Sequence, residues 1–181
     1  PALEVTLPNA ISTVDAAQRV ALTCSSSIAA VPAMRWESDE ASADALPDAV
    51  VARCRYGGFL RAPGLFDHTA FRICTVEASA VDPQHRLLLA TGYATLRRSG
   101  RNRTELAGAL LGVYVGITRS DFEALLMASP ARCGPYAVTG AALSLAAGRL
   151  SYVLDLRGPS LAVETSCSSA LVALHAAVHL T

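Results

Sequence analysis

A strand-like run, a short polar turn and a long apolar run follow one another near the C-terminal end of the chain, and they constrain the fold more than any other feature. Ser160 to Glu164 predicts a strand. From Ser166 onward, apolar residues lie on every side of the predicted helix, so we expect that helix to be buried. Cys167 stands where the turn opens into this helix.

Another helix is predicted to begin at Asp82-Pro83, because aspartate is a favourable N-cap and proline suits the first helical position. Two arginines occupy its last turn, where cations favour the helix dipole, and Gly100 follows as a stop. Three apolar residues at helical spacing form one face: Leu89, Tyr93 and Leu96.

Two further apolar segments extend the predicted core. Leu110 to Ile117 is short and rich in valine, which predicts a buried strand. Gly140 to Leu154 predicts a helix with one apolar stripe: Leu143, Ala147, Leu150 and Leu154. The acidic, alanine-rich stretch Asp39 to Asp48 predicts a loop. Helices that alternate with apolar strands favour an α/β layered fold.

Composition narrows the functional classes. Hydrophobic residues make up 52% of the 181 residues and charged residues 17%, which predicts a substantial core and excludes extensive disorder. The formal net charge is zero and lysine is absent, which excludes a strongly basic nucleic-acid binder and any lysine-based catalysis within these residues. No apolar run is long enough to span a membrane and no secretory signal is evident, so we expect a soluble, cytoplasmic protein.

The cysteines point to thiol chemistry rather than to a structural framework. They number five and form no C-x-x-C pair, which disfavours disulfides and a zinc ribbon. At the opening of a helix, Cys167 would meet free N–H groups and the positive end of the helix dipole, which favour the thiolate nucleophile. The backbone N–H of Cys167 could also donate to an oxyanion on an attacked thioester. A buried, inert cysteine is the alternative.

Cys24 offers a competing position for such a nucleophile. The segment around it, Thr23 to Val31, is similar to the segment around Cys167. Pro32 follows too closely for a long buried helix. We therefore predict that Cys167 is the nucleophile and that Cys24 is structural.

Long motifs in a fixed order now identify a family. GRLSYVLDLRGPS at Gly148 to Ser160, continuing through VETSCSSALVALH, resembles the β-ketoacyl synthase domain of type I polyketide synthases. VDPQHRLLL at Val81 to Leu89 is similar to the D-P-Q-Q-R-L-L-L motif of that family. Shorter matches stand in family order: PAMRW, GGF through Phe66-Asp67, and LGVYVG. The resemblance covers residues 30–181, which we interpret as a partial ketosynthase domain after a divergent segment, residues 1–29.

The resemblance implies a thiolase-like αβαβα fold, of which this chain holds an incomplete N-terminal half, and a homodimer formed partly through the strand near Glu164. It implies that Cys167 takes an acyl chain from the phosphopantetheine arm of an acyl carrier protein. The enolate of a decarboxylated malonyl group would then attack that thioester in a Claisen condensation. No directly bound cofactor, metal, nucleic acid or membrane is implied.

Several departures from the family pattern leave alternatives open. The H-G-T-G-T and N-x-G-H segments, which carry the family's two other catalytic histidines, do not occur in the sequence. We therefore expect this chain alone to be incomplete and inactive. One alternative is a non-catalytic ketosynthase-like interaction module, and another is a condensing enzyme of the fatty-acid or thiolase type. Glu164 stands where the family has aspartate, which we expect to alter the turn before the cysteine.

The remaining histidines and two arginines receive structural interpretations. His85 is predicted to lie at an exposed helix position, and His68 on a surface loop. His175 and His179, four residues apart, could hold a metal together with Cys167, although no further ligand is signalled nearby. Arg149 and Arg157 could bind the phosphate of a carrier arm, but we favour structural roles for them in packing and in ion pairs at helix ends.

Overall fold

The computed structural model describes residues 3–33, 35, 47–128 and 134–180. They fall into two compact units, Leu3–Pro63 and a larger one that contains Gly64–Thr181. The smaller unit holds helices α1 (Val14–Leu22) and α3 (Asp48–Cys54) and the short antiparallel pair β1 (Ala29–Ala30) and β2 (Tyr56–Gly57). Most of the loop predicted from Asp39 to Asp48 lies outside the described residues, and Asp48 itself begins α3.

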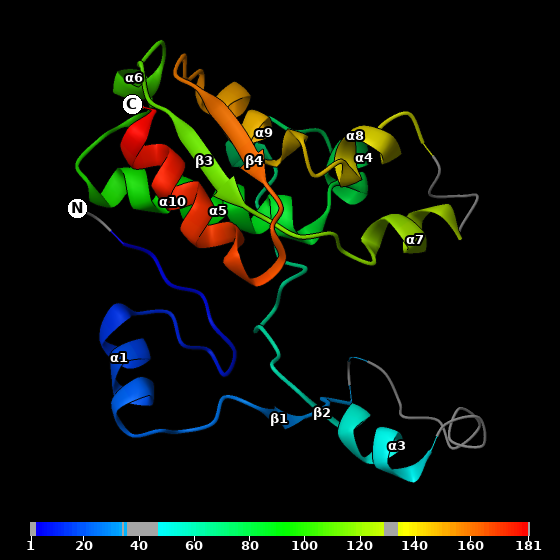
Figure 1. Ribbon diagram of the computed structural model, residues 1–181. Coiled ribbons are helices and arrows are strands. Elements are labelled where there is room, and N and C mark those ends of the chain that lie inside the picture. Colours follow the sequence, from blue (N-terminus) through cyan, green and yellow to red (C-terminus); the bar gives the residue numbers. More distant parts are fainter. Residues whose placement is uncertain (1–2, 34, 36–46, 129–133, 181) are drawn as a thin grey trace. The chain divides into compact units, whose positions relative to one another are not determined.

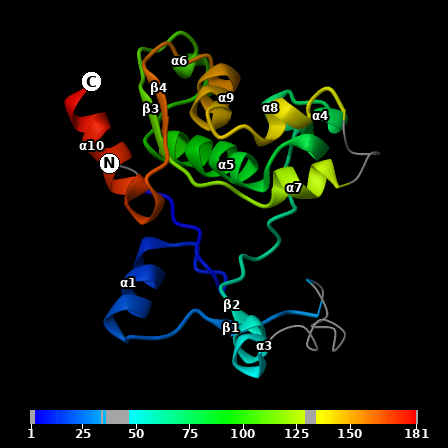
Figure 2. The same ribbon diagram turned by 45° about the vertical axis from the view of Figure 1, so that its right-hand side comes forward.

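Two parallel strands form the centre of the larger unit. β3 (Val113–Gly116) pairs with β4 (Ser160–Val163), with Val113 opposite Ser160 and Gly116 opposite Val163. Helices α5 (Pro83–Arg98) and α9 (Leu145–Leu154) cover one face of this sheet, and α10 (Ser169–His179) covers the other (Figures 1 and 2). The predicted α/β layered arrangement is therefore confirmed.

The core lies between the sheet and the α5–α9 layer. Asp82 caps α5, and its Oδ1 accepts a hydrogen bond of 2.7 Å from the Gln84 N–H, as the sequence predicts. The predicted faces of α5 and α9 both pack into this core, together with residues from β3 and from α6 (Arg103–Leu106): Leu89, Leu150, Leu154, Leu106, Val113 and Val115 are buried, and Tyr93, Leu96 and Leu143 are partly buried against them.

The helix predicted from Gly140 to Leu154 is interrupted. α8 (Ala137–Ala141) ends before α9 begins at Leu145. The physical reason is a tertiary contact, because the carbonyl of Gly140 accepts a hydrogen bond of 2.9 Å from the backbone N–H of Asp82. That carbonyl is turned to another segment of the chain, and Ala142 adopts an extended conformation after it. The predicted strand Leu110 to Ile117 is likewise shorter, since only Val113–Gly116 pairs.

The expectation that the helix after Cys167 is buried is wrong for this chain. Only Ser169 and Ala173 of α10 are buried, while Leu171 and Leu174 are 71% and 62% exposed. One side of α10 lies on β3 and β4 (Figure 2), and no described residue covers the other side. Within the described part of the chain, no helix has the length and apolar character that crossing a membrane requires.

Three short helices lie together at the end of α5 where that helix begins (Figures 1 and 2). They are α4 (Thr75–Ala80), α7 (Phe122–Met127) and α8. α8 contacts both of the others. A further 3-10 turn, η1 (Thr69–Phe71), precedes α4 and places Phe71 in the core.

Candidate active site

Cys167 lies in a tight turn between β4 and α10. The turn is a single 3-10 segment, η3 (Ser166–Ser168), and the cysteine is exposed. Ser166 adopts the left-handed conformation with φ of 54°, which is unfavourable for a residue with a side chain. This conformation lets the chain turn sharply from β4 into α10, so that Cys167 lies just beyond the end of the strand.

Hydroxyl groups on both sides of Cys167 hold the turn. The buried Ser169 Oγ accepts a hydrogen bond of 2.8 Å from the Thr165 N–H and donates one of 2.7 Å to the Ser166 carbonyl. Ser168 Oγ donates to the Thr165 carbonyl at 2.8 Å. Serine at the start of a helix commonly forms such hydrogen bonds, so a local sequence signal exists for the roles of Ser168 and Ser169.

Glu164 ties this turn to the loop that follows β3. Its Oε1 accepts hydrogen bonds from the Thr118 hydroxyl at 3.1 Å and from the Arg119 N–H at 3.2 Å. The two segments are far apart in the sequence and meet because β3 and β4 are parallel neighbours. The glutamate in place of the family's aspartate therefore bonds to backbone and side chain across the sheet.

α10 approaches β3 so closely that only glycine fits at position 116. A Cβ on Gly116 would lie 2.6 Å from the Ala170 backbone nitrogen and 2.7 Å from its Cα. Contacts this short with backbone atoms cannot be relieved by a side-chain rotation. Gly116 therefore sets the distance between the sheet and the first turn of α10, next to Cys167.

The first turn of a helix leaves backbone N–H groups without intrahelical partners, and Cys167 lies within such a segment. That this N–H donates to the carbonyl oxygen of a thioester attacked by the Cys167 sulfur stays a prediction. Cys24 is exposed too, but it follows a helix instead of preceding one. It follows α1 in the left-handed conformation, with φ of 50°, and the residues after it up to Ile28 form no helix.

His85 is buried rather than exposed, so its predicted placement is wrong. Its side chain lies in α5 with 1% exposure, and neither ring nitrogen has a hydrogen-bond partner among the described residues. Burial lowers the pKa of His85; nearby Asp82 opposes this shift and Arg149 adds to it. The prediction fails because the spacing of residues within α5 does not show which side of the helix distant segments cover.

This burial predicts a pH dependence of folding. The unfolded His85 takes up a proton below pH of about 6.5, whereas the folded chain disfavours the charged ring. Stability from the neutral ring is therefore complete above about pH 6.5 and is lost as the pH falls below it. We expect the urea midpoint of His85→Gln to fall less than that of wild type between about pH 7.5 and about pH 5.5. His175→Gln, at an exposed position, is the control. Equal pH dependence in wild type and His85→Gln would contradict the assignment.

The other histidines lie outside the turn that holds Cys167. His175 and His179 lie on exposed positions of α10 with ring centroids 4.3 Å apart. Over the described residues, no group of three or more His, Cys, Asp or Glu side chains is placed to hold a metal ion. His68 is half-buried, and its Nδ1 donates to the Ile73 carbonyl at 2.7 Å, which closes the loop around η1.

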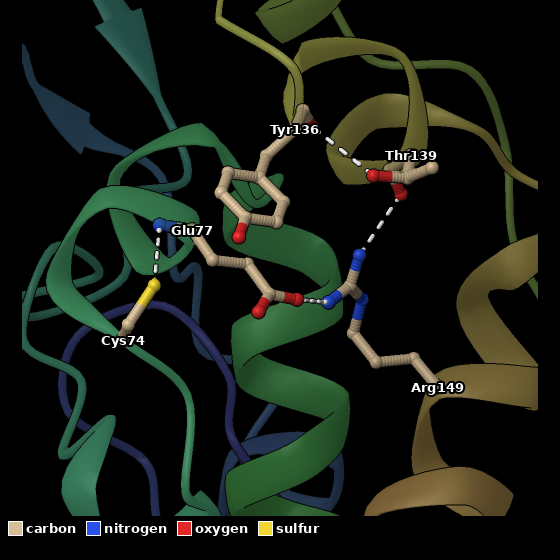
Figure 3. A network of polar contacts seen from close by, with 5 residues as sticks. All are labelled: Cys74, Glu77, Tyr136, Thr139 and Arg149. Atoms are coloured by element: carbon tan, nitrogen blue, oxygen red, sulfur yellow. Dashed lines mark hydrogen bonds and ion pairs between the residues drawn. The ribbon is translucent and has the colours of Figure 1, made fainter.

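The two arginines are both ion-paired. Arg149 is almost buried, with its side chain 10% exposed, and its guanidinium lies 2.6 Å from the Glu77 carboxylate and donates to the Thr139 carbonyl at 2.9 Å (Figure 3). Arg157 pairs with Asp155 at 2.8 Å in an exposed position. These contacts agree with the interpretation of both residues as packing and helix-end partners.

Comparison with protein families finds a match over nearly the whole chain. The model described as "Beta-ketoacyl synthase, N-terminal domain" matches residues 2–180. The chain is 39% identical over 173 residues to a mycocerosic acid synthase-like polyketide synthase of Mycolicibacterium smegmatis. The aligned region covers 94% of this chain and 8% of that protein. The chain is also 48% identical over 124 residues to the polyketide synthase GfsA of Streptomyces halstedii. That aligned region covers 68% of this chain and 2% of the synthase.

Solved structures agree with the sequence relatives. The ketosynthase from module 6 of the bacillaene synthase of Bacillus subtilis 168 superposes with a TM-score of 0.75 at 30% identity, over 96% of this chain and 27% of that one. The oxazolomycin ketosynthase domain OzmH KS7 of Streptomyces albus gives 0.76 at 33% identity, over 95% and 30%. The chain therefore spans less than a third of each solved ketosynthase and less than a tenth of each synthase.

Proposed function

Because the chain belongs to the β-ketoacyl synthase family and its relatives are type I polyketide synthases, we propose that Cys167 is the acyl acceptor of a polyketide ketosynthase. The observation that carries the proposal is the position of Cys167, exposed in a strained turn between β4 and α10. The strained residue, Ser166, directly precedes Cys167, and the turn it forms presents this thiol at the start of α10, which supports a chemical role for it.

The first half-reaction is an acyl transfer between thiols. The Cys167 thiolate attacks the carbonyl of an acyl thioester on the phosphopantetheine arm of an acyl carrier protein. Negative charge develops on the carbonyl oxygen, and the N–H of Cys167 donates to it. The carrier thiolate leaves, and the acyl chain remains on Cys167. The bonds of Ser169 and Glu164 keep the turn in place during this exchange.

The second half-reaction is decarboxylative condensation with a malonyl carrier protein. It calls on the histidines of the H-G-T-G-T and N-x-G-H segments, which are not among these 181 residues. We assign this step to the complete ketosynthase and the first step to the residues described here. The exposed apolar side of α10 then faces the rest of that domain.

The proposal includes a homodimer in the cytoplasm. In the described sheet, β4 is bonded only to β3, so its other edge is open, and Leu161 on this strand is 38% exposed. An open edge can accept the same strand of a second copy. This supports pairing through the strand that ends near Glu164.

Acyl loading tests the nucleophile. The chain is incubated with hexanoyl-N-acetylcysteamine, a thioester that copies the end of a phosphopantetheine arm, and acylation is followed by intact mass and peptide mapping. We expect the label on Cys167, and we expect Cys167→Ala to reduce loading to the background of the four remaining cysteines. Cys74→Ala, which removes another exposed thiol, is the matched control and should load normally. Equal loading of wild type and Cys167→Ala would refute the assignment.

A further inference from the structure

A pocket of about 390 Å³ lies beside the start of α5 in the larger unit, whereas Cys167 lies between β4 and α10. Its walls come from α4, α5, α7 and the residues before α8: Val76, Ser79, Ala80, Arg86, Phe122, Leu126, Gly134 and Tyr136. Apolar and aromatic groups predominate, and Arg86 is the one charged residue among these lining residues. A concave apolar site with a single charged group is typical of small-molecule binding.

The α4 wall of this pocket is held against α8, the helix that follows the lining residue Tyr136. A Cβ on Gly140 would lie 2.0 Å from the Ala80 carbonyl oxygen, so the two helices are in backbone contact. Arg149 also joins these two helices, since its guanidinium pairs with the Glu77 carboxylate of α4 and donates a hydrogen bond to the Thr139 carbonyl of α8 (Figure 3). The α4 side of the pocket is therefore fixed before a ligand binds, which lowers the cost of binding.

Part of the Arg86 guanidinium, the Nε, is buried without a hydrogen-bond partner among the described residues. Burial lowers the pKa of Arg86, which reflects the cost of holding a guanidinium away from water, and Asp82 opposes that shift. Both carboxylate oxygens of Asp82 have other partners, the Gln84 N–H and the Ser120 hydroxyl. Asp82 therefore acts on Arg86 through charge alone.

An aromatic ring lies beside the guanidinium. The Arg86 Cζ lies 6.0 Å from the centroid of the Phe122 ring, at the outer limit of a cation–π contact. Such a contact uses none of the hydrogen-bonding capacity of the arginine N–H groups. Phe122 and Leu126 of the same helix supply apolar surface beside it.

We propose that this pocket binds a small carboxylate with an apolar body, whose carboxylate pairs with Arg86 and whose body packs against Phe122, Leu126 and Val76. The planar guanidinium matches a carboxylate through two parallel hydrogen bonds. The site is separate from the acyl acceptor, so the inference does not depend on the function proposed for Cys167.

Phenylacetate and its neutral counterpart phenylacetamide test the site by calorimetry on the 181-residue chain. For a ligand of about ten non-hydrogen atoms we expect phenylacetate to bind with a dissociation constant of about 1 mM. Phenylacetamide should bind about tenfold more weakly, because it lacks the charge that Arg86 recognises. Arg86→Gln should remove this preference. Arg97→Gln, a substitution in the last turn of the same helix, should keep it.

Equal binding of the two ligands to wild type would overturn the proposal, and this result needs no variant to fold. An undiminished preference in Arg86→Gln would also overturn it, since the charge would then lie elsewhere. A preference lost equally in Arg97→Gln would show that the total charge of the helix, and not the pocket, selects the ligand. Acylation of Cys167 should proceed unchanged in Arg86→Gln, which separates this site from the proposed function.

Discussion

Gly116→Ala is expected to lower the free energy of unfolding by about 3 kcal/mol, near the upper end of the usual cost of overpacking. The new methyl group would lie 2.6 Å from the Ala170 nitrogen and equally close to the carbonyl carbon of Ser169. Both are backbone atoms, so relief requires the first turn of α10 to move away from β3. Urea unfolding followed by circular dichroism measures the change.

The same displacement should reach Cys167. Ser169 closes the turn around Cys167 through its bonds to Thr165 and Ser166, and it lies at the point of the clash. We expect Gly116→Ala to slow the loading of Cys167 by hexanoyl-N-acetylcysteamine even under conditions where the variant is folded.

Gly148→Ala is the matched control for this substitution. Gly148 lies within α9, and a Cβ there would meet nothing within 4 Å. Alanine is the better helix former by about 1 kcal/mol, so we expect this variant to gain stability and to load Cys167 normally. If Gly116→Ala were as stable as wild type, the close approach of α10 to β3 would not be a real constraint on the fold.

The elements that the sequence predicts well are those whose signals are local. Asp82 and Pro83 mark the start of α5 because capping depends on adjacent residues only. The apolar runs around Val115 and Leu161 identify β3 and β4 for the same reason. Where a distant segment intervenes, the prediction fails. The carbonyl of Gly140 bonds to the N–H of Asp82, and this contact ends α8 early.

The candidate site shows the same division. The choice of Cys167 as nucleophile rests on its own neighbours and on the resemblance they carry, and it stays a prediction. The bonds from Glu164 to Thr118 and Arg119 could not be foreseen, because they require the parallel register of β3 and β4. His85 was misplaced since its burial depends on helices from other parts of the chain. The boundary between a divergent segment, residues 1–29, and a ketosynthase part, residues 30–181, stays a prediction.

Glu77→Gln is expected to cost about 3 kcal/mol of unfolding free energy. The substitution leaves the guanidinium of Arg149, 10% exposed, without its ion-pair partner, and an uncompensated buried charge is expensive. We place the cost at the lower end of the range for buried pairs because the Glu77 side chain keeps 26% exposure. The loss should appear as a lower urea midpoint.

Arg157→Gln is the control that separates burial from the mere presence of an ion pair. Arg157 and Asp155 lie 2.8 Å apart, close to the separation in the Glu77–Arg149 pair, yet their side chains are 65% and 52% exposed. Exposed pairs of this kind contribute about 1 kcal/mol or less. If both substitutions cost the same, burial would not be what makes Arg149 important. A larger loss in Glu77→Gln would show that the buried pair, through which Arg149 joins α9 to α4, contributes more than the exposed one.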